Sequence, residues 1–97
     1  PMHGEYKMPG GKLVVIDLDV RDGRLADVQL SGDFFLEPDS ALHTINAALE
    51  GQPELASEVE LSSAVRDALA PDVMMYGLSP EAIAVAVRRA LHREAEA

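Results

Sequence analysis

Hydrophobic positions alternate along the first third of the chain, and this pattern predicts a β-hairpin. Residues 12–20 form one predicted strand, because every second position is apolar over its whole length. The face of this strand expected to be buried carries Val14, Ile16, Leu18 and Val20. Asp22-Gly23 predicts a tight turn, since this pair readily takes the positive φ values that short hairpin turns require. Residues 24–30 then return as a second strand.

The rest of the chain has a period close to that of an α-helix. Residues 33–36, which follow the break at Gly32, predict a short third strand or a bulged continuation of the second. Helices are predicted from residues 37–40 to Gly51, over residues 55–69, and from Ser79 onward, with Ser79 as N-cap. Their inward positions are Leu42, Ile45, Ala48, Leu49, Leu61, Val65, Ala68, Leu69, Ile83, Val87, Ala90 and Leu91.

These elements predict an α+β fold in one domain that spans residues 1–97. A small antiparallel three-stranded sheet, made of the hairpin plus the short third strand, would carry about three helices on one face. The length of 97 residues is close to the commonest domain size, and 47% of the residues are hydrophobic, which is enough to form a modest core.

Charge and cysteine content exclude several classes of function. The formal net charge is -9, with 17 acidic residues against 8 Lys and Arg, so no basic face for nucleic acid is expected. The chain has no cysteine, which excludes disulfides and thiolate metal sites and is typical of a cytoplasmic setting. No apolar stretch approaches the roughly 20 residues that span a bilayer, so no membrane association is expected.

No set of residues predicts self-sufficient catalysis. His3, His43 and His92 fall in three separate elements, and no serine lies in a nucleophile-elbow context, so neither a catalytic residue nor a metal ligand is expected. Asp17 and Asp19 share one strand face, which is more typical of a solvated surface than of an acid–base pair. The run Met74, Met75 and Tyr76 fits either an exposed partner surface or core filling, and we favour core filling.

A glycine-rich loop precedes the first predicted strand. Its motif consists of Lys7, Pro9, Gly10, Gly11 and Lys12. The loop is not a phosphate-binding P-loop, because the second half of that motif is absent and a strand follows it instead of a helix. The two glycines would permit close approach of another backbone or of a phosphate-bearing ligand, and the lysines would add positive charge. A plain turn with solvated lysines is the favoured alternative on these residues alone.

A second motif combines Gly32, Asp33, Phe34 and Phe35, which include the only two phenylalanines of the chain. Together the two motifs, in this order and spacing, resemble the small accessory domain of lipoate–protein ligases. The resemblance extends over residues 5–91 and includes Asp22, Gly23, Val28, Leu36, Pro38, Leu49 and Gly51. In bipartite ligases this domain is a separate subunit, and the length of the chain is similar to that separate form.

The resemblance implies a subunit that is not an enzyme alone. A separate catalytic subunit would hold ATP with Mg²⁺ and lipoate or octanoate. Its partner would be required for activation of the acid to its adenylate, before transfer to a lysine of a lipoyl carrier domain. Both motifs are then implied to lie at the partner interface or to close over the catalytic site.

Two alternatives stay open for these residues. Asp33 and the two phenylalanines would equally serve to fix the glycine loop from within the fold. The whole chain would also fit a non-catalytic binding module that docks a lipoyl carrier domain or another protein.

The order of elements is also similar to the U-type iron–sulfur cluster scaffolds. Those proteins carry cysteines at three places that correspond to the surroundings of Gly10, Asp33 and residues 75–77. This chain has no cysteine at any of them, which excludes cluster assembly although the fold resembles that of the scaffolds.

Overall fold

The main sheet contains three antiparallel strands in the order β1-β2-β3, and two short strands, β4 and β5, form a separate ribbon. The computed structural model describes the backbone of residues 1–96 and the side chains of residues 1–92. The elements along the chain are β1 (Met2–Lys7), β2 (Leu13–Arg21), β3 (Arg24–Gly32), β4 (Phe35–Glu37), α1 (Ala41–Leu49), α2 (Glu58–Ala68), β5 (Met74–Tyr76) and α3 (Pro80–Glu96).

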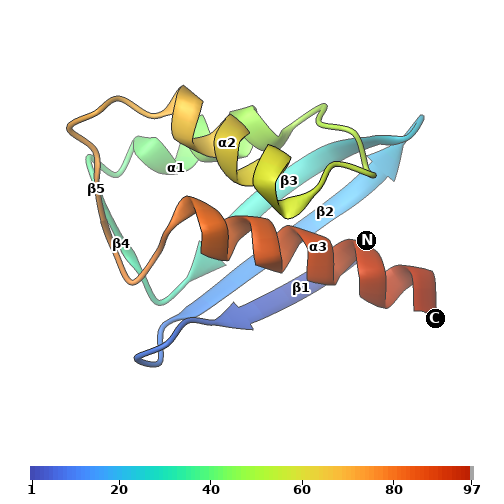
Figure 1. Ribbon diagram of the computed structural model, residues 1–97, viewed down its shortest axis with the longest axis horizontal. Helices are drawn as coiled ribbons and strands as arrows, with labels where there is room; N and C mark the ends of the chain where they lie inside the picture. Colours follow the sequence, from blue (N-terminus) through green and yellow to red (C-terminus); the bar gives the residue numbers. More distant parts are fainter. Residues whose placement is uncertain (97) are drawn as a thin grey trace.

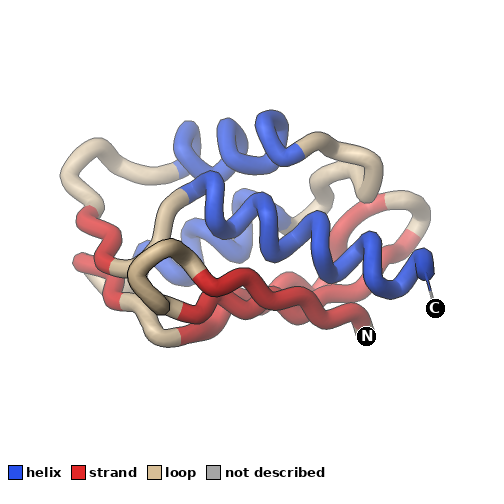
Figure 2. Tube along the Cα trace, turned by 60° about the horizontal axis from the view of Figure 1, so that its bottom comes forward, coloured by secondary structure: helices blue, strands red, loops and turns tan. Residues whose placement is uncertain are grey.

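The three helices lie on one face of the main sheet (Figures 1 and 2). Helix α3 packs across β1 and β2, α1 packs on β3, and α2 contacts both of these helices. The core between the layers is aliphatic, and its largest members are completely or almost completely buried. They are Val14, Ile16, Leu18, Leu25, Ile45, Leu49, Leu61, Val65, Ile83 and Val87. The predicted α+β class, with helices on one face of an antiparallel sheet, is therefore confirmed.

The third strand of the main sheet comes from a different part of the chain than predicted. It is β1, at the N-terminus, which pairs with β2 from Met2 opposite Leu18 to Lys7 opposite Leu13. The segment after Gly32 instead forms β4, which pairs only with β5. The prediction placed this segment wrongly, because its strand partner lies about forty residues further along the chain and leaves no local signal.

Close packing of β1 against α3 depends on Gly4. A Cβ atom at this position would lie 2.3 Å from the carbonyl oxygen of Ala86 and 2.4 Å from the nitrogen of Ala90. These contacts are with helix backbone, so no side-chain rearrangement can relieve them. A glycine inside a strand often marks such a close backbone approach, and here it lets β1 reach the helix layer.

The outer edge of β3 is covered by groups from α1 and the residues after it. The Glu50 carboxylate accepts hydrogen bonds from the amides of Asp27 and Val28, at 2.9 and 3.1 Å. The amide of Leu30 donates to the Asn46 side chain at 3.0 Å. Asp27 has φ of 53° and marks the irregularity in the pairing of β2 with β3. Satisfying these edge amides within the molecule protects the sheet from pairing with another chain.

Side chains cap the beginnings of α2 and α3. The Ser57 hydroxyl accepts from the Glu60 amide while the Glu60 carboxylate accepts from the Ser57 amide, which is a capping box. The Ser79 hydroxyl accepts from the amide of Ala82 at 3.0 Å, as the predicted N-cap requires.

Ala68 is exposed, contrary to its predicted inward position, because it lies in the last turn of α2 beyond the core. None of the described helices combines the length and apolar character needed to cross a bilayer.

The face of the sheet away from the helices carries a charged cluster around His3. Its ring forms hydrogen bonds to Glu5, at 2.7 Å, and to Asp17, at 2.6 Å. The hydrogen bond to Glu5 and then that to Asp17 raise the pKa of His3 above its ordinary value of 6.5. The charged form of His3 is thus favoured in the folded protein.

This cluster predicts a small pH dependence of stability. Because the pKa of His3 is higher in the folded state, its contribution is complete below pH 6.5 and disappears as the pH rises through the folded value. His3→Gln is expected to lower the melting temperature at pH 5.5 and to have little effect at pH 9. Solvent screening of this exposed cluster limits the loss to below about 1 kcal/mol. Thermal unfolding at the two pH values tests this, and an equal effect at both would contradict it.

Candidate functional site

The glycine-rich loop is the turn of the β1–β2 hairpin. The amide of Gly11 donates to the carbonyl of Met8, and the amide of Met8 donates to the carbonyl of Lys12, both at 2.8 Å. Gly10 and Gly11 have φ of 96° and 98°, which L side chains rarely adopt. No heavy atom lies within 4 Å of a Cβ built on Gly10. The loop is therefore an ordered turn whose glycines are required by conformation and open to solvent.

The second motif lies against the base of this loop. The Asp33 amide donates to the carbonyl of Leu13, at 3.0 Å, where β2 begins. Gly32 has φ of 145°, and a Cβ atom on it would lie 2.1 Å from the same carbonyl oxygen. The structure thus brings the two motifs of the sequence together, and Gly32 is needed for their approach.

A third segment, directly after β5, joins them. Gly77 has φ of 73°, and a Cβ atom on it would lie 2.6 Å from Cγ of Lys12. The aliphatic part of Lys12 therefore runs along the backbone of Gly77. Lys12, Asp33 and Gly77, from three separate segments, therefore converge at one end of this molecule.

The two phenylalanines of the second motif have different positions. Phe34 is half-buried and packs against the hydrophobic core. Phe35 is 77% exposed. Asp33 is also exposed, and its backbone rather than its carboxylate makes the contact with Leu13. Phe35 and the Asp33 side chain are therefore available to a partner.

The lysines of the loop differ from the arginines in whether their side chains bond to other groups of the protein. Every arginine side chain in the described part of the chain bonds to another group of the molecule, a carboxylate in two cases and a backbone carbonyl in three. The pairs are Arg21 with Asp27, Arg24 with Gly51, Arg66 with Glu81, Arg88 with Glu54 and Arg89 with Glu5. Lys7 and Lys12, the only lysines in the sequence, are exposed and enter no ion pair or hydrogen bond among the described side chains. Among the described side chains, the lysine and arginine charges that bond to no other group thus lie at the loop.

The β4–β5 ribbon exposes large apolar side chains next to this loop. Phe35 lies opposite Tyr76, and Glu37 lies opposite Met74, on the outer side of the ribbon. Tyr76 is 48% exposed and Met74 is 50% exposed. Core filling was therefore the wrong interpretation for these two residues, and only Met75 faces inward. The Met74-Met75-Tyr76 run was the feature of the sequence that indicated this surface. A run of apolar residues does not reveal which of them a two-stranded ribbon leaves exposed.

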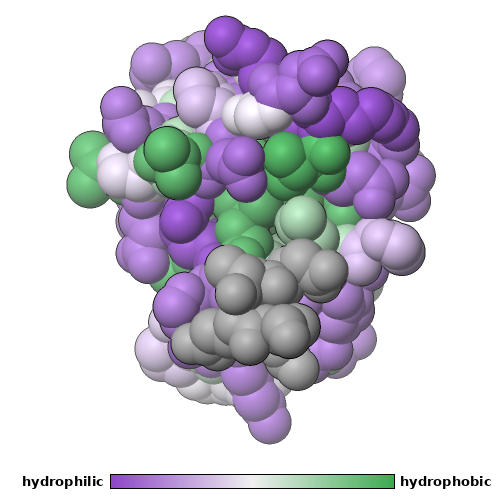
Figure 3. All heavy atoms as spheres, turned by 90° about the vertical axis from the view of Figure 1, so that its right-hand side faces the viewer, coloured by the Kyte–Doolittle hydropathy of each residue, from purple (hydrophilic) through white to green (hydrophobic). Residues whose placement is uncertain are grey.

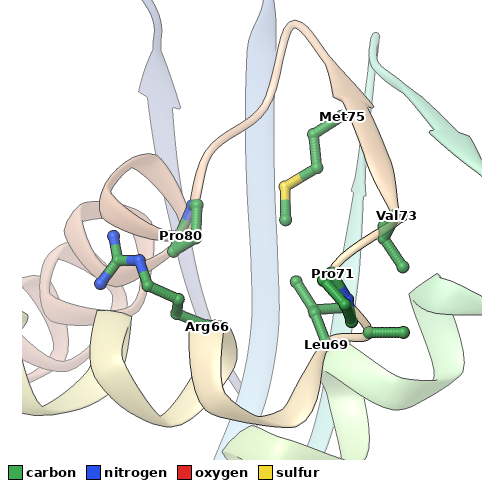
Figure 4. A pocket seen from close by; sticks show the side chains of 7 residues that line it. Arg66, Leu69, Pro71, Val73, Met75 and Pro80 are labelled. Atoms are coloured by element: carbon green, nitrogen blue, oxygen red, sulfur yellow. The ribbon is translucent and has the colours of Figure 1, made fainter.

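A shallow hollow of about 200 Å³ lies behind the ribbon (Figure 4). It is lined mainly by Leu69, Pro71, Val73, Met75 and Pro80, with Arg66 at its side. The Arg66 guanidinium is paired with Glu81. The hollow contains no nucleophile or general base, and no group of His, Asp or Glu elsewhere in the described residues is arranged to hold a metal ion. The features concentrated at this end are an open glycine turn, two lysines without a bonding partner among the described side chains, and exposed aromatic side chains.

Comparison with known proteins finds similar chains among lipoate–protein ligases. No protein-family model matches the chain. It is 29% identical over 76 residues to lipoate-protein ligase A subunit 2 of Thermoplasma acidophilum, a match that covers 78% of this chain and 77% of the relative. It also matches a chain in the solved structure of an archaeal lipoylation system from the same organism, a bipartite lipoate protein ligase with its E2 lipoyl domain. That match has a TM-score of 0.68 and 27% identity, and covers 90% of this chain and 98% of the solved chain.

Fold and site define a small α+β module that presents a glycine–lysine loop and an exposed aromatic ribbon. The chain is similar in sequence to subunit 2 of a lipoate–protein ligase, and in fold to a chain of the bipartite ligase system. The resemblance drawn from the two motifs is confirmed.

Proposed function

We propose that this chain is the accessory subunit of a bipartite lipoate–protein ligase. With a separate catalytic subunit, it is required for ATP-dependent activation of lipoate or octanoate to the adenylate. The acyl group then passes to a lysine of a lipoyl carrier domain, which contacts the complex transiently. ATP with Mg²⁺ and the acid are held by the catalytic subunit, in the cytoplasm, and this chain supplies no catalytic residue.

The observation that carries this proposal is the convergence of the two motifs at one end of the molecule. The Gly10–Gly11 turn presents backbone without side-chain bulk, and Lys12 and Lys7 present free positive charge beside it. Such a surface can close over a site that contains phosphate groups and strengthen the interactions made there by excluding water. The similarity to subunit 2 of the archaeal ligase agrees with this role.

Lipoate-dependent ATP–pyrophosphate exchange tests the proposal. The catalytic subunit from the same organism is assayed alone and together with this chain. Exchange that requires the mixture is the expected result, because the accessory subunit completes the activation site. Equal exchange with and without the chain would overturn the proposal.

The docking module is the second candidate, favoured by the exposed ribbon residues Phe35 and Tyr76. It predicts that the chain binds a lipoyl domain without changing exchange by the catalytic subunit. Titration of an isotope-labelled lipoyl domain with the chain alone distinguishes the two functions, since the accessory subunit is not expected to bind it tightly without its partner.

A further inference from the structure

We infer that the outer side of the β4–β5 ribbon is the anchor by which this chain docks on the catalytic subunit, and that this anchor is separate from the lysines that act on the bound ligand. We name Phe35, Met74 and Tyr76 the ribbon face. The inference rests on the proposed function and divides the surface at this end into a part for binding and a part for activation.

Exposure and pairing identify the ribbon face. Five large hydrophobic side chains are strongly exposed in the described part of the chain, and the ribbon face holds three of them. The register of β4 with β5 places Phe35 directly opposite Tyr76, so the two aromatic rings start from neighbouring points on the same side. Rigid, exposed aromatic side chains of this kind are the usual anchors of protein interfaces.

The fold of the ribbon does not require apolar side chains at the three positions of the ribbon face. Its inner side, formed by Leu36 and Met75, packs against the core and holds the ribbon in place. The main sheet is complete without it, because β4 and β5 pair only with each other. Polar residues on the outer side would therefore keep the fold, and the apolar ones expose surface that a partner would cover.

Continuity and charge identify the occupant as the catalytic subunit. Tyr76 is followed by Gly77, whose backbone contacts the stem of Lys12, so the ribbon face and the loop form one surface. The acidic side chain of Glu37 lies opposite Met74 on the same side of the ribbon, Asp33 precedes β4, and both are exposed. Lys12, which has no bonding partner among the described side chains, lies beside the ribbon face and is not part of it. A partner that offers an apolar recess next to nucleotide phosphates is complementary to this arrangement.

The far end of the molecule has an exposed apolar surface that can serve as a control for the ribbon face. Leu55 and Val59 are 86% and 74% exposed, and their segment lies beside the β2–β3 turn, where the Glu54 amide donates to the carbonyl of Gly23. This end is distant from the ribbon (Figure 1), and its surface is largely hydrophilic with a few apolar side chains (Figure 3). Leu55→Ser with Val59→Ser is therefore a control of similar exposed apolar area.

The experiment measures binding and activation separately. Binding of the chain to the catalytic subunit is measured by titration calorimetry, and activation by the exchange rate as a function of chain concentration. Phe35→Ser with Tyr76→Ser is expected to weaken binding at least about tenfold. The exchange rate should recover at saturating concentration, because the lysines are intact. The far-end pair should change neither quantity, and Lys12→Gln should lower the saturated rate while binding stays within about threefold.

The outcomes distinguish this inference from the proposed function. If the wild-type chain neither binds nor stimulates the catalytic subunit, the proposed function fails. If it stimulates and the ribbon variant has unchanged half-saturation, only the ribbon face is overturned as anchor. Sedimentation of the chain alone adds a further check, since a dimer that the ribbon variant abolishes would assign this face to a second copy instead. Unchanged circular dichroism of each variant confirms that the fold is retained.

Discussion

Gly4→Ala is expected to destabilise the protein by about 3 kcal/mol, because the added methyl group cannot be accommodated between β1 and α3. A Cβ atom at Gly4 would meet the oxygen of Ala86 at 2.3 Å and the nitrogen and Cα of Ala90 at 2.4 and 2.8 Å. The strand or the helix must move, and either movement opens the core around Ile16 and Val87. For a domain of this size the melting temperature should fall by about 15 °C.

Two controls make this prediction specific to the backbone contact. Ala86→Gly in the Gly4→Ala background should give no rescue, because the obstructing atoms belong to the helix backbone and not to the Ala86 side chain. Gln29→Ala, at an exposed position of β3, should change stability by no more than about 0.5 kcal/mol. A melting temperature unaffected by Gly4→Ala would show that β1 and α3 do not meet at this point.

Gly4 also shows why the first strand could not be predicted from the sequence. Only Met2 and Tyr6 are large apolar residues among the inward positions of β1, and the third inward position has no side chain. Alternation cannot be recognised over so few residues. The strand is instead stabilised by pairing with β2 and by its contact with α3, which are interactions between distant parts of the chain.

The β2–β3 hairpin and the third helix, in contrast, could be predicted, because they depend on local chemistry. Asp22 and Gly23 have φ of 53° and 74°, as the Asp-Gly turn predicts, and Ser79 caps α3 at the predicted residue. The motif residues were found for the same reason, since adjacent glycines and lysines are visible in the sequence. Their convergence with Gly77 was not visible, because it depends on the pairing of β4 with β5.

The site therefore contains one part that was predicted and one that was not. Lys12 was selected from the sequence, and the structure adds that its aliphatic stem is held by Gly77. The approach of Lys7 to a glycine is looser, since its Cε is 3.9 Å from a Cβ built on Gly11. A fixed cation contributes more to stabilising a developing charge than a mobile one, because less reorganisation is needed. Lys12 is consequently the lysine expected to dominate activation.

Lys12→Gln is expected to lower the stimulated ATP–pyrophosphate exchange rate by about 100-fold, within the role proposed above for the loop. The stem that lies along Gly77 is retained in part, and no ion pair of the described residues is broken, so the melting temperature should not change. Lys7→Gln should have a smaller effect. Exchange is measured at a saturating concentration of each variant, so that weakened binding does not enter the comparison.

Matched variants separate the position of the charge from its presence. Arg21→Gln removes one positive charge from the other end of β2, where the side chain pairs with Asp27, and it should leave the exchange rate unchanged. Lys12→Arg keeps the charge and should retain more activity than Lys12→Gln. Gly77→Ala keeps Lys12 but displaces its stem, and it should give an intermediate rate because the charge is present and misplaced. Equal rates for Lys12→Gln and Arg21→Gln would mean that the net charge of the chain, and not the site beside Gly77, controls activation.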